Sequence, residues 1–166
     1  MCISIETRRQ LGETYSPVKG LFRQYELTYV VGDERDLVRC RTGYRKEQVY
    51  LYRAEGSPEV LRNVFLDYIR TINSLRDHPQ WYNTLTGNCT TQIRGHVRPF
   101  AERASRWSWK LVLNGYVDEM AYENGTLDGR LTFHELKIAS HVNARARAAD
   151  DDPHFSTRIR EGLPGF

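Results

Sequence analysis

A cysteine stands where the sequence predicts the start of a helix, in the run Asn88-Cys89-Thr90-Thr91. Asn88 is a favoured N-cap residue, so Cys89 would lie in the first helical turn. The N–H groups of that turn favour a thiolate, which is the form that attacks carbonyl carbon, and they could hold the oxyanion that the attack creates. Cys89 is therefore a candidate nucleophile supported by Asn88, Thr90 and Thr91. The alternative is an unreactive cysteine that is only a small apolar residue of the helix.

The segment before this helix is a polar loop that carries aromatic side chains. Trp81, Tyr82 and Asn83 lie in it, and the two rings offer a wall against which an acyl chain could pack. Because the loop leads directly into Asn88, the three residues are expected to support the thiol.

A thiol nucleophile usually works with a histidine base. His96 follows Cys89 by seven residues on the same helix, which places it about 10 Å away along the axis and out of hydrogen-bonding range. The other histidines are His78, His134, His141 and His154. None of the five is placed by sequence as a convincing base.

The sequence gives little support for a bound metal ion or cofactor. The three cysteines, Cys2, Cys40 and Cys89, form no CxxC pair, have no zinc-type histidine spacing and cannot make a disulfide framework. Neither a phosphate-binding glycine loop nor a serine nucleophile elbow is present. We expect no cofactor and no metal.

The charge of the chain is weakly basic. The net charge is +3 and the isoelectric point is near 8.8, which is too little to indicate nucleic-acid binding. A local basic stretch runs from Arg94 to Lys110, and it could face lipid headgroups or nucleic acid or simply water. We expect no nucleic-acid partner.

Length and patterning predict one α+β domain over residues 1–166. A mean hydropathy of −0.62 and the lack of a long apolar run exclude a membrane-spanning helix, and residues 1–9 do not resemble a secretory signal. Residues 33–45 and 107–114 carry no clear pattern. Strands are expected at residues 1–9, 22–31 and 48–53. Helices are expected from Pro58 to before Pro79, at residues 89–98 and at residues 115–123. A last helix is expected to start at a Thr132 capping box and to run to about Arg147.

Several motifs resemble those of one bacterial family, the Lnb N-terminal periplasmic domain. The resemblance covers nearly the whole chain, and its most specific part is the Asn-Cys-Thr-Thr run in its Trp-Tyr-Asn context. The matching segments are Ser4-Ile5-Glu6-Thr7-Arg8, Gly12–Pro17, Asp33–Asp36, Trp81–Thr91, Asn114–Glu119, His141–Ala146 and Phe155–Arg160.

This resemblance implies a circularly permuted papain-like fold of the NlpC/P60 type, with a small antiparallel sheet and packed helices. Cys89 matches the position of the nucleophile. The family's named member is implicated in N-acylation of lipoproteins, so the resemblance implies thiol-dependent acyl transfer or hydrolysis at the periplasmic face of the inner membrane, with a phospholipid or lipoprotein as substrate. The alternative is a non-catalytic envelope module that binds lipid or protein.

The resemblance also implies that the base histidine lies on a strand upstream of Ser4–Arg8. On that expectation the chain is an N-terminally truncated piece, inactive by itself, that lacks the histidine strand and the membrane helices of longer relatives. Glu6 would then orient the missing histidine, although a glutamate facing solvent is the simpler alternative.

Overall fold

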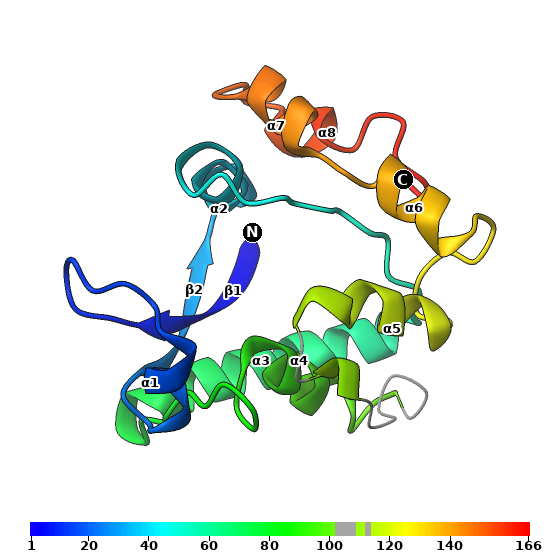
Figure 1. Cartoon of the computed structure of the whole chain (residues 1–166). Coiled ribbons are helices and arrows are strands. Elements are labelled where there is room, and N and C mark those ends of the chain that lie inside the picture. Colours follow the sequence, from blue (N-terminus) through cyan, green and yellow to red (C-terminus); the bar gives the residue numbers. More distant parts are fainter. Residues whose placement is uncertain (102–108, 112–113) are drawn as a thin grey trace. The chain divides into compact units, whose positions relative to one another are not determined.

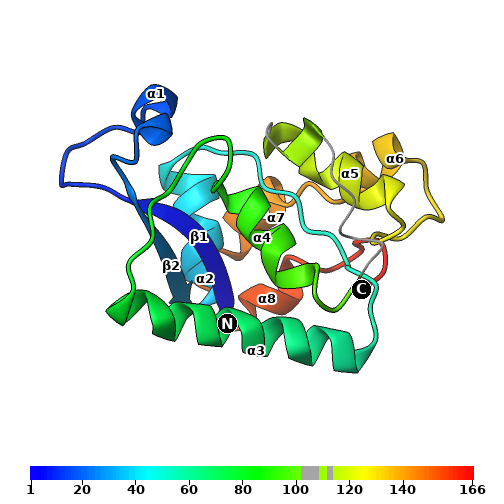
Figure 2. The same ribbon diagram turned by 90° about the horizontal axis from the view of Figure 1, so that it is seen from below.

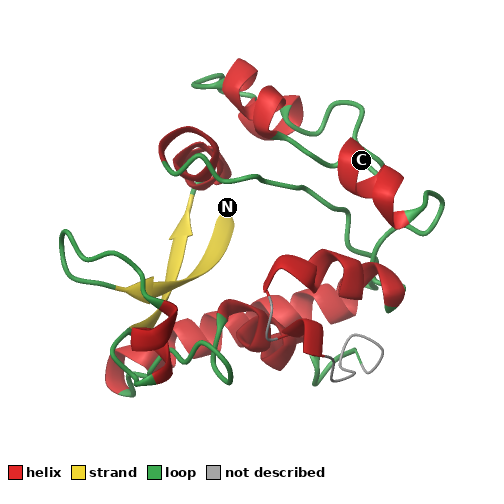
Figure 3. Ribbon diagram, viewed as in Figure 1, coloured by secondary structure: helices red, strands yellow, loops and turns green. Residues whose placement is uncertain are grey.

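The protein has an α+β fold, which confirms the expected class. The computed structural model describes residues 1–101, 109–111 and 114–166. In these residues β1 (Cys2–Arg8) and β2 (Glu26–Gly32) form a two-stranded antiparallel sheet (Figures 1 and 3). The helices are α1 (Pro17–Leu21), α2 (Glu34–Arg39), α3 (Pro58–Asp77), α4 (Cys89–Val97), α5 (Val117–Glu123), α6 (Phe133–Ala139), α7 (Asn143–Ala149) and α8 (Phe155–Arg158).

The chain divides into two compact units. The first comprises Met1–Ser4, Val31–Glu55 and Gly125–Phe166, and the second comprises Ile5–Val30 and Gly56–Asn124. Each unit has a hydrophobic core of its own and is described separately below. A single domain over residues 1–166 stays a prediction.

The long helix α3 is the main element of the second unit. The Ser57 side chain accepts a hydrogen bond from the Val60 N–H, and Pro58 occupies the first turn, where its missing N–H costs nothing. The helix ends at Asp77, before Pro79, as predicted. Its half-buried residues recur at three- and four-residue spacing, and α4 packs beside it (Figures 1 and 2).

The core of the second unit lies where β2 meets the segment before α4. Tyr25, Leu27 and Tyr82 are buried there together. The Leu27 N–H donates to the Gln80 carbonyl over 2.8 Å, and the Tyr82 N–H donates to the Tyr25 carbonyl over 2.8 Å. These bonds anchor the aromatic loop to β2.

The core of the first unit joins α7 to α8. Four side chains are buried together there: Ala146, Ala149, Phe155 and Ile159. The partly buried side chains of Val38 and Leu51 pack against them. A bidentate ion pair also holds α2 to the segment after α8. The Arg160 guanidinium donates to both Glu34 carboxylate oxygens, over 2.7 and 2.6 Å.

The strand predicted at residues 48–53 is wrong. This segment is extended, but in the described structure it belongs to no named strand and makes isolated bridges. The buried Asn143 side chain accepts from the Val49 N–H and donates to the Glu47 carbonyl, each over 2.8 Å. The Asn143 side-chain amide thus makes hydrogen bonds that a neighbouring strand would otherwise make. An alternating sequence pattern does not show that the partner of the segment is a distant side chain.

The single helix predicted from residue 133 to about Arg147 is also wrong. The Thr132 capping box is present and starts α6, but α6 ends at Ala139 and α7 begins at Asn143. In the linker, the Ser140 carbonyl accepts from the Leu51 N–H and the Val142 N–H donates to the Val49 carbonyl. Pairing with a distant segment therefore interrupts a locally helical pattern.

The two segments without a clear sequence pattern differ in outcome. Residues 33–45 form α2 and a π-helical turn, Cys40–Tyr44. Half of residues 107–114, and Arg103 and Arg106 of the basic stretch, lie outside the described residues. Lys110, at the end of that stretch, pairs with Glu119 and Glu123 of α5.

Among the helices that the structure describes, none has both the length and the apolar character needed to cross a bilayer.

Gly20 allows α1 to lie against the loop that follows Trp81. An added methyl group would overlap the Thr84 hydroxyl oxygen, far inside van der Waals contact. We expect Gly20→Ala to lower the free energy of unfolding by about 1–3 kcal/mol in urea denaturation. Gly95→Ala is the matched control because its methyl group meets nothing within 4 Å, and alanine in a helix should stabilise by up to about 1 kcal/mol. Equal midpoints for the two variants would contradict this packing.

Candidate functional site

Cys89 is the first residue of α4, and Asn88 is its N-cap, as the sequence predicts. The Asn88 side-chain oxygen accepts a hydrogen bond from the Thr91 N–H over 2.9 Å. Its amide nitrogen donates to the Thr84 carbonyl over 3.0 Å, and its own carbonyl accepts from the Thr91 hydroxyl over 2.9 Å. Because Asn88 is almost completely buried, these bonds fix the loop and the helix start to each other.

Cys89 is a free cysteine, and the residue as a whole is partly buried. Burial raises the pKa of Tyr82, and so do the Tyr15 side chain and the charge of a Cys89 thiolate, so the Tyr82 hydroxyl stays protonated at neutral pH. Tyr82 is therefore a neutral hydroxyl in the loop that leads to the thiol.

The Tyr15 side chain packs against Tyr82. Tyr15 and Tyr82 meet edge to face with ring centroids 6.3 Å apart. The Tyr15 hydroxyl lies 3.3 Å from the Thr84 hydroxyl, which in turn donates to the Pro17 carbonyl over 2.9 Å. These contacts hold the Tyr15 ring against Tyr82.

The first turn of α4 is less open to an oxyanion than the sequence suggests. The Thr91 N–H is taken by the Asn88 side-chain oxygen, so it is not free to bind an oxyanion. Thr90 is buried and follows Cys89 directly.

Asn83 shapes the loop itself. Its side-chain oxygen accepts from the Leu85 and Thr86 N–H groups, each over 2.9 Å, and its amide nitrogen donates to the Leu21 carbonyl over 3.2 Å. Asn83 thus folds the turn and ties it to α1. Its contacts are with the backbone.

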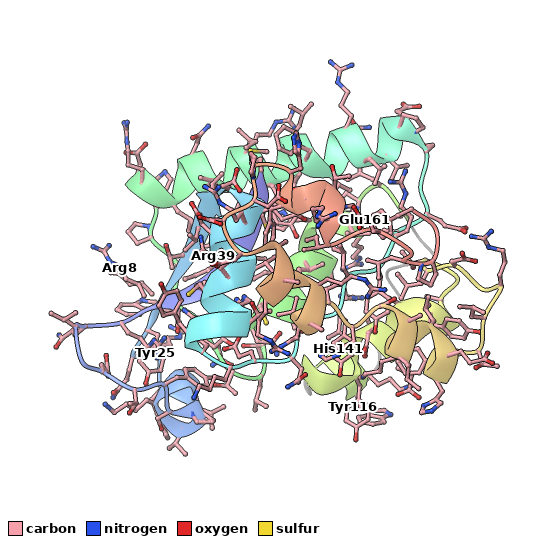
Figure 4. All side chains as sticks on the ribbon, turned by 90° about the horizontal axis from the view of Figure 1, so that it is seen from above. Arg8, Tyr25, Arg39, Tyr116, His141 and Glu161 are labelled. Atoms are coloured by element: carbon pink, nitrogen blue, oxygen red, sulfur yellow. The ribbon has the colours of Figure 1, made fainter. Side chains whose placement is uncertain are left out.

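The Trp81 side chain is about half exposed. It lines an open cleft of about 540 Å³ together with Arg8, Glu13 and Glu26 and three further residues. Arg8, which Figure 4 shows at the outside of the ribbon, pairs with Glu26 over 3.3 Å. Glu6 lies half-buried in β1. Supporting roles for Trp81 and Glu6 stay predictions.

A buried histidine network on the same helix was not predicted. His96 is buried, with Nδ1 2.7 Å from the Asp67 carboxylate and Nε2 2.8 Å from the Tyr29 hydroxyl. The Tyr68 ring stacks on the imidazole with centroids 3.9 Å apart. All polar atoms are satisfied when Nδ1–H donates to Asp67 and the Tyr29 hydroxyl donates to Nε2. Burial raises the pKa of Tyr29, and raises that of Tyr68 to about 12, in keeping with protonated hydroxyls.

Both ring nitrogens of His96 are thus bound away from Cys89. The only sequence signal for this network is that Asp67 and Tyr68 lie on the half-buried face of α3. His141 belongs to the first unit, where its Nε2 lies 2.6 Å from the Gln48 side chain. In the part of the chain that the structure describes, no three histidine, cysteine or acidic side chains are grouped to hold a metal ion.

One comparison with known proteins gives a match. The family model of the Lnb N-terminal periplasmic domain matches residues 1–115. No curated protein matches, and no solved structure matches. The matched range includes both strands, the aromatic loop and all of α4.

The His96 network predicts a graded loss of stability. His96→Ala leaves Asp67 and Tyr29 without their partner and should lower the free energy of unfolding by about 2–4 kcal/mol, whereas Tyr29→Phe removes one hydrogen bond and should cost about 1 kcal/mol. Tyr68→Phe is the control, since phenylalanine keeps the stacked ring. Urea denaturation measures all three variants. A loss for His96→Ala no larger than that for Tyr68→Phe would show that the network does not hold α4.

Proposed function

The chain belongs to the family of Lnb N-terminal periplasmic domains, and from that premise we propose that Cys89 is the nucleophile of an acyl transfer or acyl hydrolysis at the bacterial cell envelope. The family indicates a periplasmic location. The proposal includes a permuted papain-like arrangement of the NlpC/P60 type, a place at the periplasmic face of the inner membrane, and a phospholipid or lipoprotein as substrate.

The proposed reaction has two steps. The Cys89 thiolate attacks the carbonyl carbon of an ester, the bond to the leaving oxygen breaks, and the released alkoxide takes a proton to become an alcohol. This leaves a thioester on the sulfur. An amine or a water molecule then attacks the thioester carbon, loses a proton, and returns the thiolate while forming an amide or an acid.

The observation that carries this proposal is the position of the thiol. Cys89 opens a helix of nine residues, where the helix dipole favours an anionic side chain. Tyr82, in the loop before α4, would donate its protonated hydroxyl to the oxyanion of each step. Tyr15 packs edge to face against the Tyr82 ring and is itself in contact with the Thr84 hydroxyl.

The base of the reaction is not His96, because Asp67 and Tyr29 occupy both of its ring nitrogens. A free thiol that reaches water can lose its proton directly to it, which is enough for slow acylation by an activated ester.

We therefore expect slow stoichiometric acylation of Cys89. The native chain is incubated with the p-nitrophenyl ester of a short fatty acid, and intact and peptide mass spectrometry locate the adduct. One acyl group should appear on Cys89 and should be released by hydroxylamine, as a thioester is. Tyr82→Phe should slow the acylation about tenfold to a hundredfold by removing one oxyanion donor.

Matched controls exist in the same chain. Cys89→Ser should abolish the adduct, whereas Cys2→Ser and Cys40→Ser should acylate at the native rate. Acylation spread over Cys2, Cys40 and lysines, or none at all, would rule out Cys89 as the nucleophile and would leave the non-catalytic binding module.

A further inference from the structure

The polar cleft beside Trp81 lies on the face of β2 that points away from the core. Tyr25 and Leu27 are buried in the core, and neighbouring side chains of an extended segment point to opposite faces, so Glu26 points outward. Trp81 forms an antiparallel bridge with Glu26, which puts the two side chains on the same face. Arg8 of β1 joins them through its ion pair with Glu26. One surface of the second unit therefore carries an indole beside an arginine–glutamate pair.

The Trp81 indole is a fixed aromatic surface. The Tyr82 N–H donates to the Tyr25 carbonyl and the Leu27 N–H donates to the Gln80 carbonyl, so the backbone is held to β2 on both sides of Trp81. Among the described residues, no ring or cation contacts the Trp81 ring and none hydrogen-bonds to its side chain. A preorganised aromatic face that the protein leaves uncovered loses little conformational entropy when a ligand packs on it.

Two glutamine side chains add hydrogen-bonding groups to this cleft. Gln10 and Gln24 both line it. Gln10 bonds to Glu13 through its backbone, and neither glutamine side chain has a hydrogen-bond partner in the part of the chain that the structure describes. A side-chain amide both donates and accepts. The pair therefore suits a ligand rich in hydroxyl groups, which also donate and accept.

The charges in the lining of the cleft balance. Two arginines, Arg8 and Arg9, stand against two glutamates, Glu13 and Glu26. The Arg8 guanidinium pairs with Glu26 over 3.3 Å. The Glu13 carboxylate pairs with Lys19 over 3.0 Å, and Arg9 donates to the Glu13 backbone carbonyl over 3.5 Å. Because the lining has no excess of either sign, it favours a neutral polar ligand over a phosphate or a carboxylate.

A second hollow adjoins the cleft, since Arg8 and Glu26 line both. Its volume is about 430 Å³, and it is also lined by apolar residues of α3 and of the segment after it, among them Ile72, Leu75 and Pro79. All of these residues belong to the second unit. An extended ligand could therefore pass the ion pair and occupy both hollows.

We propose that this cleft binds a neutral oligosaccharide that extends into the second hollow. The C–H groups on one face of a pyranose ring pack on Trp81, and the hydroxyl groups at the ring edge bond to Gln10 and Gln24. The Arg8–Glu26 pair offers a charged donor and a charged acceptor where the two hollows meet. This binding goes beyond the proposed function, because it needs no reaction of Cys89.

Isothermal titration calorimetry of the full chain with cellotetraose, chitotetraose and maltotetraose tests the cleft. At least one tetramer should bind saturably, and its dimer should bind at least about tenfold more weakly because it does not fill both hollows. Trp81→Ala should weaken binding at least about tenfold, whereas Trp81→Phe keeps a flat ring and should retain most of it. Gln24→Ala should weaken binding about threefold to tenfold by removing a hydrogen-bonding group.

Trp109→Ala is the matched control, because Trp109 is 53% exposed, against 54% for Trp81, but does not line the cleft. This variant should bind as the native chain does, and excess inorganic phosphate should not compete. Cys89→Ser should also bind normally, so failure of the thiol chemistry would leave the result unchanged. The proposal is overturned if no tetramer binds, if a dimer binds as tightly as its tetramer, if Trp81→Ala binds as the native chain does or no worse than Trp109→Ala, or if phosphate displaces the sugar.

Discussion

The buried Asn88 side chain is the constraint on which the site depends. Its oxygen caps α4 and its nitrogen holds the loop that contains Thr84, so one amide joins the two segments that surround the sulfur. The same loop is bonded to α1 through Asn83. The start of α4, the aromatic loop and α1 are therefore parts of one hydrogen-bonded assembly within the second unit.

The features that the sequence predicted correctly are governed by local contacts. Asn88, Ser57 and Thr132 cap helices because a side-chain oxygen reaches an N–H group three residues ahead, a geometry that depends only on nearby residues. Cys89 at the helix start follows from the same rule. The α+β class follows from the order of strand and helix patterns.

The features that it missed depend on partners far away in the chain. Asn143 replaces a strand beside Val49, and the pairing of Val142 with the same residue breaks the helix predicted there. His96 meets Asp67 and Tyr29, which lie 29 and 67 positions away. The periodicity of the sequence indicates which face of a helix is buried, but not which polar group of a distant segment contacts that face.

The central claim is that Cys89 is the thiol of this chain that attacks acyl groups, and a second cysteine provides an internal reference. Burial and the nearby Glu34 carboxylate raise the pKa of Cys2, so Cys2 is less ionised than an ordinary thiol at neutral pH. The most direct measurement is the rate of iodoacetamide alkylation of each cysteine in the native chain as a function of pH, read by peptide mass spectrometry. The account predicts that Cys89 is alkylated faster than Cys2 at neutral pH and that the reaction of Cys2 becomes appreciable only as the pH rises. Alkylation of Cys2 at neutral pH as fast as that of Cys89 would contradict it.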